Sequence, residues 1–528
     1  MKSIWRRAWA LAAALCLVCT GAWAELGWVD DQLSGFLDIN SDTTFSLGIQ
    51  VNTLQPFGEE ITAMLNETLE HIRVETRILD DGTQMSFAVG GESVFTVEEA
   101  LRDNRMAMTT SLLPNRVLVA DESPMDIISG NEMAVEPDFD LYAAITDAEN
   151  CYEALTEAIV PYATEKAANY KISGIGYARW VRLARLGTED SAKLLPQIIR
   201  VLGCGMDQSF RERLQTLTCA DQFTIALYSD EENGTPLALY MKGSVYLTPE
   251  DKWTLAYQWA FTREDDKSKD TYRYELVQVS SPKHKRVIEA ERTNTTDENG
   301  KLQLNRECEL ALRDDSRNCT ILNKDKLILE RDGSQQTLTG SVATTVKDHS
   351  GGETVTTVTT ITPELTLTSA QGSGVLSGQV NLEEHQGKTV YRDLTFLLDE
   401  EPAQALDAAA ASGSLFAVDV NPRDPSVAGS SLAQNVDVVW SDDSLKGFLV
   451  GNPPIGMASY PVPETMQTID LTLAEETQRA ALLDEMAQRG AGVLLIALGK
   501  LPGEPLRLLM DSMTEVDYAA FLSLLGDL

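Results

Sequence analysis

The sequence predicts an α+β protein built around a long antiparallel β-meander. Between residues 222 and 400, apolar and polar residues alternate with a period of two, which is the periodicity of strands with one buried face. Turn sequences such as Asn233-Gly234 and Asp332-Gly333 separate the alternating segments and favour hairpins. The pattern predicts about eleven strands in up-and-down order, in a sheet that curls because a long flat sheet leaves reactive edges.

A secretory signal peptide is predicted at residues 1–24. Lys2 and Arg6 form a basic start, Ala8–Thr20 is apolar, and small residues end at Ala24. The apolar run is shorter than the about 20 residues that a membrane-spanning helix needs. We therefore expect cleavage after Ala24, a secreted or extracytoplasmic chain, and no transmembrane span once the signal is removed.

Residues 25–135 are predicted to form a small α+β domain. Alternation over Phe45–Val51 indicates a strand, and a helical stretch follows Pro56. Thr96 and Glu99 have the spacing of a capping box, which predicts a short helix between strands.

A helical segment is expected at residues 136–221, before the β-meander domain at 222–400. Pro161 should end its first helix, and further helices are expected over Tyr177–Leu186, Ala192–Leu202 and Ser209–Leu217. Residues 401–528 are expected to hold an irregular linker and C-terminal helices. Thr472 and Glu475 open one of these helices, and Thr514 and Asp517 cap the last.

Charge excludes one large class of partner. The formal net charge is −37, from 80 acidic and 43 basic residues. Such a field repels nucleic acid, whose binding depends on neutralising phosphates. No cofactor or metal site is predicted. A calcium loop at Asp38, Asn40 and Asp42 is not expected, because Thr43 and Ile49 replace the glycine and closing glutamate.

Five cysteines remain after signal removal, so at least one thiol must be unpaired. Cys308 and Cys319 flank a turn-like stretch between two predicted strands. An exported chain permits disulfides, and these two residues are the candidate pair across a hairpin.

Three arginines form the sharpest local feature. Arg179, Arg182 and Arg185 are spaced by three on a predicted helix, and the neighbouring helices carry Arg200, Arg211 and Arg213. Such a stripe is a candidate anion-binding site, because guanidinium groups bind carboxylates and phosphates. The alternative is ion pairing with the excess of acids in this chain.

No catalytic motif is present, and the chain is expected to be non-enzymatic. Ser280 and Lys283 match SxxK, but Pro282 lies between them and the companion motifs are missing.

In its order of elements, the chain from about residue 140 to 410 resembles periplasmic lipoprotein carriers and related apolar-ligand binders. The resemblance implies a curled sheet with helices across its concave side. The first hypothesis is accordingly an exported binding protein that holds an apolar or amphipathic ligand between sheet and helices. The alternatives are an extracellular or cell-surface interaction module with a protein partner and no small-molecule site, and a hydrolase with an unrecognised acidic site.

Overall fold

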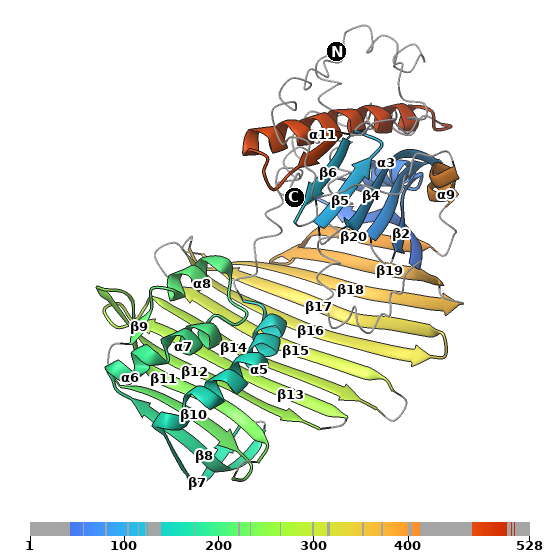
Figure 1. Cartoon of the computed structure of the whole chain (residues 1–528). Helices are drawn as coiled ribbons and strands as arrows, with labels where there is room; N and C mark the ends of the chain where they lie inside the picture. The colour runs from blue at the N-terminus through green and yellow to red at the C-terminus, as the bar shows by residue number, and fades with distance from the viewer. Residues whose placement is uncertain are drawn as a thin grey trace.

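The computed structural model describes residues 43–121, 139–399, 404–411 and 467–503, apart from short gaps within these ranges. One connected sheet of 21 strands dominates the structure (Figure 1). None of the helices in the described part of the chain is long and apolar enough to cross a membrane.

The strands form a ladder in which most neighbours are consecutive in the chain. Strands β10 to β20 follow one another, each antiparallel to the next. Strand β8 pairs with β10 and carries β7 at its other side. The strands are β1 (Thr43–Leu54), β2 (Ile72–Leu79), β3 (Gly82–Val89), β4 (Glu92–Arg102), β5 (Arg105–Thr110), β6 (Arg116–Ala120), β7 (Ala163–Ile172), β8 (Gly176–Leu186), β9 (Thr218–Cys219), β10 (Phe223–Ser229), β11 (Pro236–Thr248), β12 (Asp251–Arg263), β13 (Lys267–Gln278), β14 (Lys285–Thr296), β15 (Leu302–Arg313), β16 (Asn318–Asp332), β17 (Gln335–Asp348), β18 (Val355–Ala370), β19 (Ser373–Gln386), β20 (Thr389–Asp399) and β21 (Gln467–Asp470).

The N-terminal strands continue the same ladder. Strand β20 pairs with β1 in antiparallel register, and β1 also begins a run of antiparallel neighbours from β2 to β6. Two pairings are parallel, between β1 and β19 and between β6 and β21. The sheet is therefore mixed.

Helices cover the sheet in two places. Helices α5, α7 and α8 lie on one side of the strands around β10–β15, whereas α11 crosses the N-terminal strands (Figure 1). The helices are α3 (Glu59–Leu69), α5 (Leu141–Ala158), the 3-10 helix η1 (Val160–Tyr162), α6 (Thr188–Lys193), α7 (Leu195–Leu202), α8 (Gln208–Leu214), α9 (Gln404–Ala411) and α11 (Glu476–Gly499).

Beneath α5, α7 and α8 lies a large core of aromatic and aliphatic side chains. Tyr257, Trp259 and Tyr274 are completely buried in it. Phe210 of α8 meets Tyr274 edge to face, with ring centroids 6.4 Å apart. Burial of large aromatic rings stabilises such a layer through apolar area and ring geometry together.

A second core joins the N-terminal strands to the far end of the ladder. Phe45 and Leu47 of β1 pack in one cluster with Leu394 and Phe396 of β20, and Leu65 of α3 closes it. Strands β1 and β20, far apart in the sequence, thus bury their apolar side chains against each other.

A row of buried charges lies between the two cores. Asp270, Arg292, Arg306 and Asp325 are directly opposite one another on the neighbouring strands β13 to β16. We call these four residues the charged row; each is at least nine-tenths buried. Opposite residues of a ladder share a face, so the row lies on the face that carries both cores.

The hydrogen bonds of Asp270 tie three strands together. Its carboxylate accepts from Trp259 Nε1 at 3.1 Å, from Arg263 at 2.9 Å and from Arg292 at 2.9 Å. Arg306 forms an ion pair with Asp325 at the other end of the row. Burial raises the pKa of Asp325, and the charge of Arg306 opposes that rise. The two outer acids thus offset the repulsion between adjacent arginines.

The predicted α+β fold, with an eleven-strand meander beside a separate small α+β unit, is wrong. The structure is mostly one mixed sheet of 21 strands, because β20 pairs with β1 and the N-terminal strands extend the ladder. The pairing partner of an edge strand is set by long-range packing, which local periodicity does not reveal.

Two predicted helices are strands. Tyr177–Leu186 forms β8, paired on both sides, and the capping-box residues Thr96 and Glu99 lie in β4. Tertiary pairing overrides local helix signals in both places. The helix expected after Thr472 is present as α11, capped by Glu475 and Gln478, whereas the helix expected at Thr514 falls outside the described residues.

Candidate functional site

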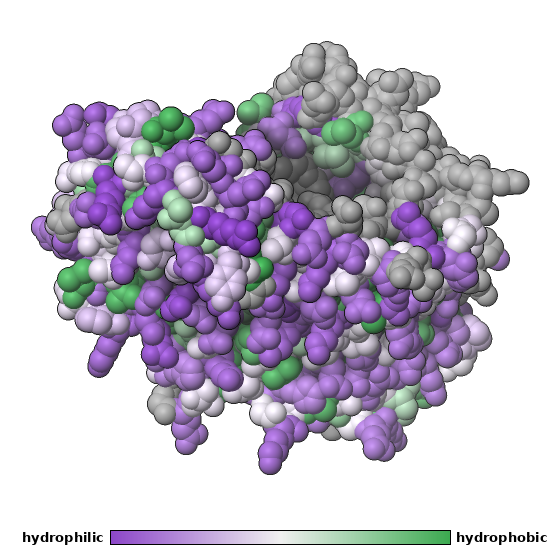
Figure 2. Space-filling view, turned by 90° about the horizontal axis from the view of Figure 1, so that it is seen from below, coloured by the Kyte–Doolittle hydropathy of each residue, from purple (hydrophilic) through white to green (hydrophobic). Residues whose placement is uncertain are grey.

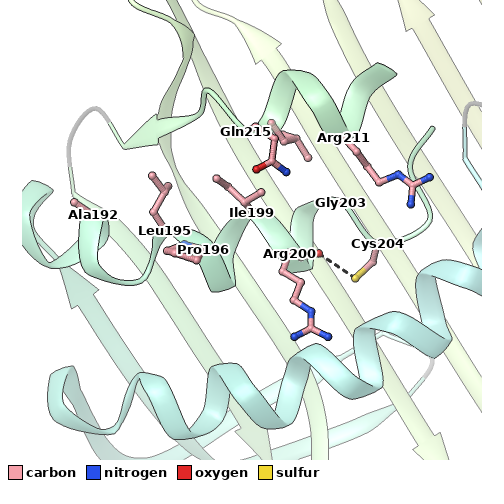
Figure 3. A pocket seen from close by; sticks show the side chains of 10 residues that line it. Ala192, Leu195, Pro196, Ile199, Arg200, Gly203, Cys204, Arg211 and Gln215 are labelled. Atoms are coloured by element: carbon pink, nitrogen blue, oxygen red, sulfur yellow. Dashed lines mark hydrogen bonds between the residues drawn. The ribbon is translucent and has the colours of Figure 1, made fainter. Parts of the chain in front are cut away.

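A pocket of about 550 Å³ lies on the helical cover, between α7 and α8 (Figure 3). Its apolar wall comes mainly from Leu195, Pro196 and Ile199 of α7 and Leu214 of α8. Arg200, Arg211 and Gln215 supply polar groups at its rim, and Cys204 lies between the two helices. A few polar groups beside an apolar wall are typical of small-ligand sites.

Helix α8 is held in place by a charge-assisted cap. The Asp207 carboxylate accepts a hydrogen bond from the Phe210 backbone N–H at 2.8 Å and pairs with Arg286 at 3.0 Å. Burial acts to raise the pKa of Asp207, but hydrogen bonds from Ser209 and Phe210 and the Arg286 charge outweigh it and lower the pKa. The guanidinium of Arg286 also lies 4.3 Å from the Phe210 ring centroid, so one arginine of β14 fixes both the cap and the first turn of α8.

The loop between α7 and α8 depends on a glycine. Gly205 has φ +66°, and a Cβ there would lie 2.2 Å from the Asp140 carbonyl oxygen. The Asp140 N–H donates to the Gly205 carbonyl at 2.7 Å. Only glycine fits this conformation and approach, which brings the loop against the start of α5.

The two arginines give the pocket a positive rim in an acidic protein. Arg200 extends from α7 toward α5, and Arg211 extends from α8 on the other side of Cys204 (Figure 3). Arg200 forms no ion pair with any residue that the structure describes. An arginine free of acidic partners, in a chain with almost twice as many acids as bases, is available to an added anion.

The predicted arginine stripe does not form. Its three members lie on strand β8, where successive side chains point to opposite faces. Arg182 therefore lies on the face opposite to Arg179 and Arg185, and it pairs with Glu165 of β7 at 2.6 Å. Arg179 and Arg185 are exposed and have no ion pair within the described chain. The spacing of three would give one stripe only on a helix.

Cys308 and Cys319 do not form the predicted disulfide. Neither cysteine is in a disulfide, and the register places Cys319 opposite Leu312, four residues from Cys308 along β15. Burial raises the pKa of Cys308 to about 12. The predicted turn is present between β15 and β16, but the two cysteines lie at different levels of the hairpin.

Other sequence features fall outside the site. The Asp38 loop and the signal segment lie outside the described residues. Among the positions that the structure does describe, no group of three or more histidine, cysteine, aspartate or glutamate side chains is arranged to hold a metal ion.

Sequence reasoning placed Arg200 and Arg211 on neighbouring helices but missed the pocket between them. The available signals were Pro196 at the start of a helix and Gly203 and Gly205 at its end, which together mark a tight helix–loop–helix. The core that two short helices share sets the direction in which they pack. The helix–loop–helix motif alone does not specify that direction.

The sequence predicted a carrier that holds an apolar ligand between the sheet and the helices, and this prediction is wrong. Tyr257, Trp259 and Tyr274 fill the space between sheet and helices, so the apolar residues proposed to line a cavity form a packed core. The pocket on the outside of the helices is a site that none of these hypotheses placed there.

The acidic hydrolase is not supported either. The buried carboxylates of Asp270, Asp325, Asp470 and Glu485 each face an arginine, as ion-paired structural groups do.

Comparison with known proteins gives little similarity. No protein-family model matches the chain, and no curated protein matches it. Among solved structures, one titled "Crystal structure of Pseudomonas aeruginosa OccK3 (OpdO)" is similar with a TM-score of 0.25 and 8% sequence identity. The alignment covers 70% of this chain and 98% of that one. A TM-score of this size does not establish a common fold.

Proposed function

We propose that this chain binds a small organic anion in the pocket between α7 and α8. The observation that carries the proposal is the rim: Arg200 and Arg211 border a pocket of about 550 Å³ in a chain with a net charge of −37. Export is supported by residues 1–24, and N-terminal sequencing of exported protein, starting at Glu25, tests it.

The lining favours a carboxylate or phosphate attached to a short carbon skeleton. Guanidinium groups donate paired hydrogen bonds to such head groups. Leu195, Ile199 and Leu214 offer apolar contact to the remainder of the ligand, and Gln215 offers an amide. Because the overall field of the protein repels anions, binding must depend on these local contacts.

Isothermal titration calorimetry of the processed chain with inorganic phosphate, succinate and citrate tests the proposal. Arg200→Ala should weaken binding of the best of these anions roughly tenfold or more, since a hydrogen bond to a charged group contributes about 1.5–3 kcal/mol. Arg200→Lys should restore part of the affinity by keeping the charge.

Arg213→Ala is the matched control, because Arg213 lies on the same short helix as Arg211 but does not line the pocket. If none of the three anions binds, or if Arg200→Ala and Arg213→Ala weaken binding equally, the pocket between α7 and α8 is not the anion-binding site that we propose.

A further inference from the structure

A second surface lies on the other side of the sheet from α5, α7 and α8. It is formed by β7, β8, β10 and β11, at one end of the ladder (Figure 1). Three of its cations, Lys166, Arg185 and Lys242, are exposed and have no ion pair with any described residue. In so acidic a chain, three such cations on one surface form a distinct positive patch.

The strand register shows that these cations share a face. Arg185 is opposite Thr224, which is opposite Lys242, so the two cations lie two strands apart. Neighbouring strands are about 4.8 Å apart, which places their backbones about 10 Å from each other. Lys166 lies opposite Val181, which is opposite Tyr228, in a parallel row of the same face.

Tyrosines occupy the space between the cations. Tyr170 stacks on Tyr228 with ring centroids 5.0 Å apart and an interplanar angle of 20°, and Tyr170 is 46% exposed. Tyr240 lies beside them, on the strand that carries Lys242 two residues later. Burial, followed by the neighbouring Tyr170 and Tyr240, raises the pKa of Tyr228. We call Tyr170, Tyr228, Tyr240, Lys166, Arg185 and Lys242 the tyrosine–cation surface.

Farther along the ladder, acidic and basic side chains of the same face pair with each other. Glu275, Glu289 and Glu291 occupy the corresponding face of β13 and β14. Glu275 lies two strands from Lys242 and is within 3.8 Å of Arg273. Arg273 and Lys269 of β13 thus have acidic partners, whereas no ion pair to a described residue is formed by Lys166, Arg185 or Lys242.

We infer that the tyrosine–cation surface binds a segment of an anionic polysaccharide, such as a uronate polymer. Tyrosine rings present flat apolar faces with a polar tip, which suit the C–H face and hydroxyls of a sugar ring. The cations are placed to pair with carboxylates carried by those rings, and an open sheet face admits a linear chain. The inference is independent of the pocket between α7 and α8.

Two other binding partners, nucleic acid and a lipid bilayer, fit this surface less well. Nucleic acid needs many closely spaced phosphate contacts, whereas this surface has three cations without an ion pair to a described residue. A lipid bilayer favours a larger exposed apolar area. Figure 2 shows a mainly hydrophilic face of the molecule. On the described parts of β7, β8, β10 and β11, the exposed large hydrophobic side chains are Tyr170 and Tyr177.

Binding of the processed chain to polygalacturonate, measured by affinity electrophoresis and calorimetry, tests the inference. We expect binding that weakens as salt is raised, with neutral amylose bound at least about tenfold more weakly. Tyr240→Ala and Lys242→Ala should each reduce affinity about fivefold or more, and Tyr240→Phe should retain it. Far-UV circular dichroism verifies that each variant is folded.

Glu289→Gln, on the ion-paired part of the same face, is the control and should not reduce binding. Arg200→Ala should leave polygalacturonate binding unchanged, which separates this surface from the pocket. Equal binding of amylose, binding to phosphatidylglycerol vesicles but not to polygalacturonate, absence of any binding, or full affinity in Lys242→Ala would each overturn the inference.

Discussion

At the scale of single residues, Asp270 has the most extensive polar contacts of the charged row. It is 1% exposed and accepts hydrogen bonds from Trp259 and Arg263 of β12 and from Arg292 of β14. Removing a partner from a buried ion pair is far more destabilising than the net contribution of the pair suggests, because a desolvated charge remains.

We therefore predict that Asp270→Ala lowers the free energy of unfolding by about 3–5 kcal/mol. Urea unfolding followed by tryptophan fluorescence measures it. Glu291→Ala is the control: Glu291 pairs with Lys269 but its side chain is 53% exposed, so the loss should stay below about 1 kcal/mol. Equal losses in the two variants would show that the charged row is not stabilised by Asp270.

Residue types in the candidate sites were partly predictable from the sequence. The sequence singled out arginines, but the spacing of Arg179, Arg182 and Arg185 makes a stripe only if the segment is helical. On β8 the same spacing divides the three residues between two faces. Lys242, Tyr228 and Tyr240 gave no local signal, because strand register alone brings them beside Arg185.

At the scale of elements, β21 is attached to the N-terminal strands by an acidic side chain. Asp470 forms a bidentate pair with Arg105 of β5, with both N–O distances 2.8 Å. The hydrogen bond from Arg105 lowers the pKa of Asp470 below its ordinary value, against the opposing effect of burial. Because the folded-state pKa is lowered, the ion pair contributes its full stabilisation above the unfolded-state pKa of about 3.9. This stabilisation is lost as pH falls through the folded-state pKa.

We predict that Arg105→Ala destabilises the protein clearly at pH 7 and much less once the pH is below the lowered folded-state pKa of Asp470, where Asp470 is protonated in both proteins. Urea unfolding of wild type and variant at a series of pH values gives this difference. Lys193→Ala, which removes the exposed pairs of α6, should change stability little at either pH. A difference between wild type and Arg105→Ala that is independent of pH would contradict the assignment.

Elements were predictable where the local pattern and the tertiary environment agree. Alternation predicted a strand over Leu302–Leu312, and β15 spans Leu302–Arg313. Tyr177–Leu186 was predicted as a helix because its apolar residues also fit a period near 3.6, yet pairing with β7 and β10 makes it a strand. Propensity is a weak guide where backbone hydrogen bonds can be satisfied by neighbours.

At the scale of the whole molecule, close backbone contacts between strands require glycines inside the sheet. Gly340 of β17 has φ +132°, and a Cβ there would lie 2.0 Å from the Lys326 carbonyl oxygen of β16. A strand interior with such a residue departs from the flat pleat, as curled sheets require.

We predict that Gly340→Ala lowers the free energy of unfolding by about 1–3 kcal/mol or more, because alanine is strained at this φ and meets the next strand. Gly499→Ala, at the end of α11, where no atom lies within 4 Å of the added Cβ, should be nearly neutral. Urea unfolding measures both variants. A neutral Gly340→Ala would mean that β16 and β17 can separate without loss of stability.

The continuity of the sheet was not predictable from the sequence. Each hairpin between β10 and β20 is a local event, marked by its own turn residues. The pairing of β20 with β1 joins segments that have no sequence signal for each other, and it depends on the shared core of Phe45, Leu47, Leu394 and Phe396. Long-range pairing of this kind reflects total burial and not local preference.

The pairing of β1 with β20 also sets an order in time. Asn52 donates a hydrogen bond to Asp393, 341 positions later in the chain. At a synthesis rate of roughly 5–20 residues per second, β1 leaves the ribosome about 17–70 s before its partner exists. During that interval its apolar side chains and one row of backbone hydrogen-bonding groups have no native cover. A nascent chain of this design needs a holding chaperone, or delayed folding, to avoid aggregating before its last strands arrive.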